Sequence, residues 1–85
     1  MYRYEDEKAR VFTEQGQIMF LQIRDRIKKA LSETGAITIG NAITGCSGSS
    51  FTMLACIDRL VELGEIVILH RSPTQLSVIV GGNHE

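Results

Sequence analysis

The hydroxyl-rich stretch TGCSGSS, residues 44 to 50, contains the residue types best suited to chemistry in this sequence. Its centre, GCSGS, departs from the G-x-S-x-G motif of a catalytic serine, because Ser49 stands where the second glycine is required. No acid–histidine pair accompanies Ser47 in an order that would activate it, and the Lys-Ser/Thr pair of a P-loop is absent. We therefore expect no enzymatic activity. The stretch predicts a tight turn with hydroxyl caps at a helix start, where an anion such as a DNA phosphate is favoured.

The cysteines and histidines form no pattern that binds a metal or supports acid–base catalysis. Cys46 and Cys56 lie ten residues apart, with no C-x-x-C pair and no zinc-ligand spacing to a histidine. His70 and His84 are separated in sequence from each other and from both cysteines. We expect two reduced thiols in or near a cytosolic core, no metal and no cofactor.

The charge of the chain argues against strong non-specific binding to nucleic acid. The formal net charge is −1, whereas such binding depends on Lys and Arg that neutralise phosphates. Seven of the nine basic residues precede residue 30, and only Arg59 and Arg71 follow it. The run RDRIKK, residues 24 to 29, is typical of a solvated helix face, with a border of a nucleic-acid site as the alternative.

Length and composition predict one small domain with a thin core. The chain has 85 residues, of which 44% are hydrophobic and 6% aromatic, so aliphatic side chains must build most of the core. Such a core gains from a partner surface, which favours a homodimer. The opening MYRYEDEKAR is charged where a signal peptide needs an apolar segment, and no apolar run reaches membrane-spanning length. We therefore expect a cytoplasmic protein.

Apolar spacing and turn residues predict the elements that position the hydroxyl-rich stretch. The first is a helix over residues 14 to 34, capped by Thr13 and ended by Gly35. The others follow in chain order: a short strand at AITI (36–39), one or two helical turns within GNAITGC (40–46), a tight turn at SGSS (47–50), a helix over residues 50 to 63, and strands within EIVILHR (65–71) and QLSVIV (75–80). Leu54, Ile57, Leu60 and Val61 form the predicted buried stripe of the second long helix.

The predicted hairpin needs a further layer, because two strands alone are not stable in water. The strand AITI can supply a third strand and close a small antiparallel sheet against the helices. Residues 1 to 12 are expected to be a loosely ordered N-terminal segment, residues 13 to 80 the domain, and residues 81 to 85 a flexible tail.

This order of elements resembles the winged helix-turn-helix fold over residues 13 to 80. The resemblance is carried by AITI, by NAITGCSGSSFTMLACIDRLVELGEI and by the hairpin VILHRSPTQLSVIV. It implies an α+β domain of three helices with a two- to three-stranded antiparallel sheet, the wing. With Gly48 as the turn glycine, Ile43 precedes it by five residues, and Leu54 and Ile57 follow by six and nine. Those offsets place apolar residues where two crossing helices touch.

The resemblance implies that the second helix of the pair enters the DNA major groove with its N-terminal residues at the base edges. The implied DNA-binding residues lie on this helix and at the wing tip: Ser47, Ser49, Ser50, Thr52, Met53, Arg59, Arg71 and Gln75. Cys56 is expected on the same exposed side as Arg59. The helix departs from a strong reader, because its first two turns lack the Arg, Lys, Asn or Gln that pair with base edges.

Two functions follow from this reasoning. The first expectation is a small transcriptional regulator that binds double-stranded DNA. The alternative is a winged-helix module that binds another protein without binding DNA, because a fold does not fix a function. The surface around residues 49 to 59 distinguishes them: a neutral, apolar surface favours a protein partner. DNA is favoured if the following basic residues converge there: Arg24, Arg26, Lys28, Lys29 and Arg71.

Overall fold

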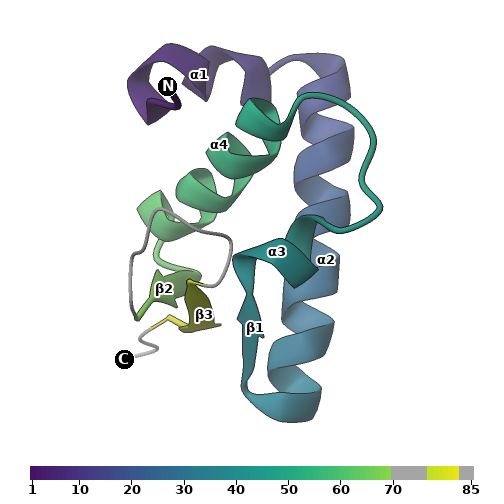
Figure 1. Cartoon of the computed structure of the whole chain (residues 1–85), viewed down its shortest axis with the longest axis vertical. Helices are drawn as coiled ribbons and strands as arrows, with labels where there is room; N and C mark the ends of the chain where they lie inside the picture. Colours follow the sequence, from purple (N-terminus) through teal and green to yellow (C-terminus); the bar gives the residue numbers. More distant parts are fainter. Residues whose placement is uncertain (70–76, 83–85) are drawn as a thin grey trace.

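The computed structural model describes residues 1–69 and 77–82, which form a small α+β domain. Its elements run in this order: α1 (Tyr4–Val11), α2 (Glu14–Thr34), β1 (Ala36–Thr38), α3 (Ile39–Ile43), α4 (Ser50–Glu62), β2 (Ile66–Ile68) and β3 (Val78–Gly81). In Figure 1, α2 forms a long column on one side, α1 and α4 lie on the other, and β2 and β3 lie below α4. The predicted α+β class is confirmed, and the layout is consistent with a winged helix.

The sheet has three antiparallel strands in the order β1-β3-β2 among the described residues. Ile79, fully buried in the central strand, is opposite Ile37 of β1 and Ile68 of β2. The expectation that AITI supplies a third strand is therefore confirmed, although Ile39 already belongs to α3. Gly81 ends β3, and the Gly82 N–H donates to the Glu65 carbonyl at 3.0 Å. The remainder of the predicted tail, residues 83–85, lies outside the described residues.

Both predicted ends of α2 are confirmed by their hydrogen bonds. The Thr13 hydroxyl accepts from the Gly16 N–H at 3.0 Å, which satisfies a donor of the first turn. Gly35 has φ 83° and donates its N–H to the Leu31 carbonyl at 2.9 Å, an arrangement that favours glycine. Within the described residues, no helix combines the length and the apolar character needed to cross a membrane.

The core lies between α2, α4 and the sheet. α2 contributes Phe20, Ile23 and Ile27. α4 contributes Met53, Cys56, Ile57 and Leu60 from one face, and the fully buried Ala55 from the opposite face. The predicted stripe is right at Ile57 and Leu60, whereas Leu54 and Val61 are only partly buried at the margin of the core. The face that enters the core is therefore rotated from the predicted one toward Met53 and Cys56.

The N-terminal segment differs from the expectation of a loosely ordered stretch, because it contains the helix α1. Its first turn carries the acidic residues Glu5, Asp6 and Glu7, and its last turn carries Lys8 and Arg10. This distribution complements the helix dipole. The helix ends at the fully buried Val11, and its side chains contact α4. Because the segment is rich in charges of both signs, its sequence shows no clear helical spacing of apolar residues, and its contacts could not be predicted from such spacing.

We expect Gly16→Ala to destabilise the fold, although alanine is favoured over glycine by about 1 kcal/mol inside an ordinary helix. A Cβ atom at Gly16 would lie 1.9 Å from the Arg10 carbonyl oxygen, where α1 meets α2. Relief of this contact requires backbone movement, with an expected loss of roughly 1–3 kcal/mol in the free energy of unfolding. Urea denaturation measures it.

The matched control is Gly81→Ala, because a Cβ atom there meets nothing within 4 Å. We expect its free energy of unfolding to change by about 0.5 kcal/mol or less. A Gly16→Ala variant that is more stable than the wild type would contradict the close packing of α1 on α2.

Candidate functional site

The face of α4 opposite the core is the surface that a groove-reading helix would present to DNA. Its residues are Phe51, Ala55, Asp58 and Glu62, which recur at intervals of three and four along the helix. Ala55 is nevertheless 0% exposed. The middle of this outward face of α4 is therefore covered by another part of the chain, while Phe51 and Glu62 at its two ends stay exposed.

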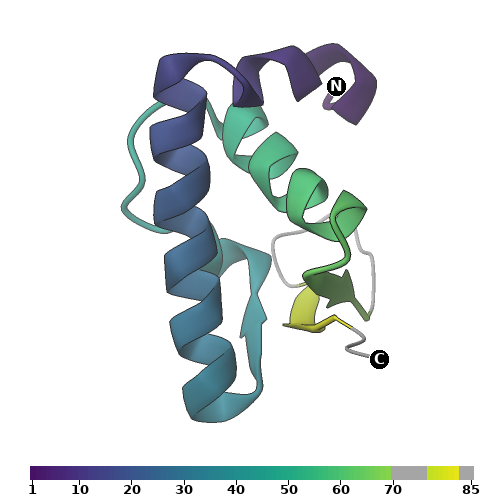
Figure 2. The ribbon, with the colours of Figure 1, turned by 180° about the vertical axis from the view of Figure 1, so that it is seen from behind.

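Helix α1 and the residues before it provide that cover. The Tyr2 hydroxyl donates to the Asp58 carboxylate at 2.7 Å. The Tyr2 ring also lies 5.8 Å, between centroids, from the ring of Phe51, within the range of favourable aromatic pairs. Figures 1 and 2 show α1 above α4, on the side away from the sheet. α4 thus has the core on one face and α1 on the other.

Glu62 is the principal polar contact between α1 and the C-terminal end of α4. Its carboxylate accepts from the Tyr4 hydroxyl at 2.7 Å and the Lys8 ammonium at 2.9 Å. Arg59 donates to the same carboxylate at 2.9 Å, and its guanidinium lies 5.2 Å from the centre of the Phe12 ring. One carboxylate therefore joins three donors from two helices.

These contacts change the acidity of both partners. The hydrogen bonds from Lys8, Tyr4 and Arg59 lower the pKa of Glu62 to about 2. Burial, and then the hydrogen bond to Glu62, raises the pKa of the Tyr4 hydroxyl to about 12. The pair is therefore in its bonding form, carboxylate and neutral phenol, across the neutral range.

The predicted DNA-binding residues divide into three groups in the structure. Ser47, Ser49 and Ser50 are exposed at the start of α4. Thr52 and Met53 are 7% and 5% exposed, so neither lies on an exposed face of α4, and their role in DNA binding stays a prediction. Met53 is buried because it lies on the core face of α4, and Thr52 is buried because it lies beside that face.

The remaining predicted residues also do not form an exposed surface that could contact DNA bases within the described residues. Cys56 is 0% exposed and packs in the core, so its expected place on an exposed side is wrong. Burial raises the pKa of its thiol to about 11. Arg59 is ion-paired with Glu62. Arg71 and Gln75 lie outside the described residues.

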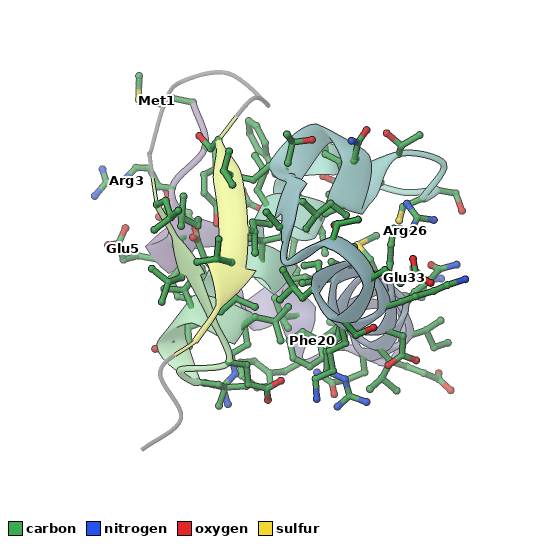
Figure 3. The ribbon with its side chains drawn as sticks, turned by 90° about the horizontal axis from the view of Figure 1, so that it is seen from below. Met1, Arg3, Glu5, Phe20, Arg26 and Glu33 are labelled. Carbon is green, nitrogen blue, oxygen red and sulfur yellow. The ribbon has the colours of Figure 1, made fainter. Side chains whose placement is uncertain are left out.

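The basic residues of α2 do not converge on α4. Arg26 donates to the carbonyl oxygens of Ala42 and Thr44, at the end of α3. Lys28 lies 3.6 Å from a Glu65 carboxylate oxygen, and Arg24 pairs with its neighbour in sequence, Asp25. Figure 3 shows Arg26 on the α2 side of the molecule, opposite Met1, Arg3 and Glu5. The criterion that would favour DNA is therefore not met by the described residues.

A cavity of about 660 Å³ lies beside the start of α4. Arg10 and Thr13 line it from the junction of α1 and α2, Gln22 from α2, Ser49 from the N-cap position of α4, and Thr52 from its first turn. We call it the α4 cavity. It brings together hydroxyl residues that the sequence singled out and an arginine that it did not.

Besides the side that packs in the core, the sheet has a second apolar surface, which was not predicted from the sequence. The strand register places two rows of residues on the side away from the core: Ala36, Val80 and Val67 in one row, and Thr38, Val78 and Leu69 in the next. Val67 is 41% exposed and Leu69 is 66% exposed. We call these six residues the outer sheet face. The signal was present in the runs IVIL and VIV, which lack the polar alternation of a sheet with one solvated face.

A comparison of the chain with known protein families, curated proteins and solved structures finds no match. Its function must therefore be inferred from the placement of residues within the fold. The arrangement offers three surfaces: the outward face of α4, which α1 covers, the α4 cavity, and the outer sheet face.

We expect the contribution of Glu62 to stability to disappear in acid. Its pKa in the folded protein, about 2, lies below the ordinary value of 4.5. The contribution is therefore fully present above pH 4.5 and is lost as the pH falls through 2. In urea denaturation, Glu62→Gln should unfold more easily than the wild type near neutral pH, and this difference should shrink across that acid window.

The exposed Glu33 on α2 provides the control, because Glu33→Gln changes the same charge without a contact to α1. Its unfolding should follow the wild type at each pH. A difference between Glu62→Gln and the wild type that stays constant from neutral pH to pH 2 would contradict the proton linkage of this contact.

Proposed function

We propose that the chain is a winged-helix module that binds a protein partner and does not read DNA through α4. The observation that carries this proposal is the packing of α1 and Tyr2 on the outward face of α4, with Ala55 fully buried and the Tyr2 ring tilted against the Phe51 ring. The B-DNA major groove is about 12 Å wide, and one helix with its side chains is about 10–12 Å across. The groove therefore cannot admit α4 together with α1.

The charges around the covered helix support the same conclusion. Asp58 and Glu62 lie on its outward face, and Arg59 is held by Glu62. Phosphate neutralisation requires free cations, and it supplies most of the non-specific affinity for DNA. Insertion of α4 would bring two carboxylates toward the groove and would require the loss of their hydrogen bonds to α1.

The outer sheet face is the surface that we assign to the partner. Val67, Leu69, Val78 and Val80 do not belong to the core cluster, yet they form adjacent rows on β3 and on β2 with the residue that follows it. An exposed set of apolar side chains is typical of a contact with another protein. None of the six residues is charged. We therefore propose a partner that presents apolar side chains, because a nucleic acid would find no cation among these six residues.

The DNA regulator stays as a second candidate because of the three exposed serines at the start of α4. Ser47, Ser49 and Ser50 make no side-chain hydrogen bond within the described residues. Their hydroxyls are free to contact a phosphate. This function would require α1 to leave α4, with loss of the contacts of Tyr2, Tyr4 and Lys8.

The first test is a fluorescence-anisotropy titration of the purified protein into labelled random-sequence duplex DNA at low and moderate salt. We expect no salt-sensitive binding tighter than about 10 µM, the range that non-specific DNA binders reach. Salt-sensitive binding that is tighter than this, and that is lost in Ser49→Ala/Ser50→Ala, would support the DNA regulator and overturn the proposal.

The second arm of the test identifies the partner. A photo-cross-linking amino acid replaces Leu69 in the test protein and Glu33 in a control protein. Proteins that cross-link to the test protein but not to the control are identified and purified. Such a partner should bind the wild type and Glu33→Gln equally, and Val67→Ser/Leu69→Ser about tenfold or more weakly. Equal binding by the double variant would show that the outer sheet face is not the contact.

A further inference from the structure

Two residues, Phe12 and Thr13, make the turn between α1 and α2. Phe12 has φ −92° and ψ 2°, beside the helical region, whereas Thr13 has φ −75° and ψ 164°, which is extended backbone. The ψ angle of Thr13 therefore accounts for most of the change in direction. No proline lies between residues 4 and 34, and Gly16 is the only glycine there. Rotation of this one angle to about −42° would join α1 and α2 into one continuous helix.

Side chains hold this turn in place of helical hydrogen bonds. The Thr13 hydroxyl donates to the Arg10 carbonyl at 2.8 Å and accepts from the Gly16 N–H at 3.0 Å. The side-chain amide of Gln17 donates to the Val11 carbonyl at 2.6 Å. The turn also needs glycine at position 16, because a Cβ atom there would lie 1.9 Å from the Arg10 carbonyl oxygen. A continuous helix would need none of these features, since backbone N–H groups four residues along would bond to the same carbonyls.

A continuous helix would carry α1 away from the α4 of its own chain. Figures 1 and 2 show α1 turning back from the end of α2 to lie above α4. A straight helix over residues 4 to 34 would be about 46 Å long, whereas the longest dimension of the molecule is 29 Å. α1 would then project beyond its own domain and uncover Ala55 on the outward face of α4. The segment that this face accepts in the structure is α1, so α1 of a second copy fits it equally well.

Two exposed apolar residues of α2 provide a second and independent observation. Ile18 is 64% exposed and Leu21 is 45% exposed. In the sequence, Tyr4, Val11 and Ile18 recur at intervals of seven, and Leu21 follows by three, which is the spacing of one helix face. Tyr4 bonds to Glu62, and Val11 is fully buried, so this is the face by which α1 docks. The turn separates Val11 from the exposed Ile18, whereas a straight helix would extend the docking face through Ile18 and Leu21.

We propose that the chain forms a domain-swapped dimer, in which α1 of each copy covers α4 of the other. Tyr2, Tyr4 and Lys8 then make the contacts with α4 that they make within one chain in the structure, but across two copies. Each copy gives and receives one α1, so the assembly is closed and two-fold symmetric. The dimer forms as the protein concentration rises, and the closed monomer predominates when the protein is dilute. The outer sheet face takes no part in the exchange and stays available to a partner.

The experiment begins with equal amounts of ¹³C-labelled and unlabelled protein, unfolded together in urea and refolded at high protein concentration. Size-exclusion chromatography with light scattering measures the dimer fraction. In the isolated dimer, isotope-filtered nuclear Overhauser effects should join the Tyr2 ring of one copy to the Phe51 ring of the other, because these ring centroids lie 5.8 Å apart. Thr13→Ala/Gly16→Ala should lower the dissociation constant of the dimer about tenfold or more, because both changes favour the straight helix and disfavour the turn.

Ser32→Ala is the matched control, because it raises the helix propensity of α2 at an exposed position far from the turn, and it should dimerise as the wild type does. Val67→Ser/Leu69→Ser should also dimerise normally, which separates the exchange from a contact through the outer sheet face. A dimer whose Tyr2–Phe51 effects all arise within one copy would overturn the proposal, as would a Thr13→Ala/Gly16→Ala variant that stays monomeric. Where the double variant fails to fold, Thr13→Ala alone gives the same test, because it adds no Cβ atom at position 16.

Discussion

The Glu62 carboxylate receives hydrogen bonds from Tyr4, Lys8 and Arg59, and through them it fixes α1 against α4. Apolar contacts at the other end of α4, between Tyr2 and Phe51, complete the same interface. The other surfaces depend on this docking. With this docking Ala55 is fully buried on the outward face of α4 and Arg10 lines the α4 cavity, while Val67 and Leu69 of the outer sheet face stay exposed.

α4 and the sheet show the same departure from an ordinary amphipathic element. A surface helix has one apolar stripe, whereas a helix with apolar residues on opposite faces is buried on both. The outward face of α4 combines the fully buried Ala55 with Asp58 and Glu62, and the N-terminal segment packs there and bonds to both carboxylates. The sheet is apolar on both sides as well, but its outer face has no cover among the described residues. This asymmetry is why we assign the partner to the sheet rather than to the helix that the winged-helix resemblance favours.

Local chemistry made much of the fold predictable, and contacts distant in sequence limited the rest. Thr13 and Gly35 are capping signals that act within one turn, so the ends of α2 were correct. Met53 and Cys56 were placed outside because the stripe through Leu54 and Val61 fits helical spacing almost as well. The sequence did not predict α1, because this segment is highly charged and its contacts join residues more than 50 positions apart in sequence, such as Tyr2 and Asp58. The same holds for the α4 cavity. Its hydroxyl residues could be identified from the sequence, whereas the position of Arg10 beside them results from the packing of α1 and could not.

The most direct test of the account is whether α1 covers α4 in solution. Nuclear Overhauser effects between the ring protons of Tyr2 and Phe51 measure this, because the ring centroids lie 5.8 Å apart. We predict clear cross-peaks between these rings, together with effects from the Tyr4 ring to the Glu62 side chain. Absence of both sets in the folded protein would contradict the cover, and would return α4 to the role of an open recognition helix.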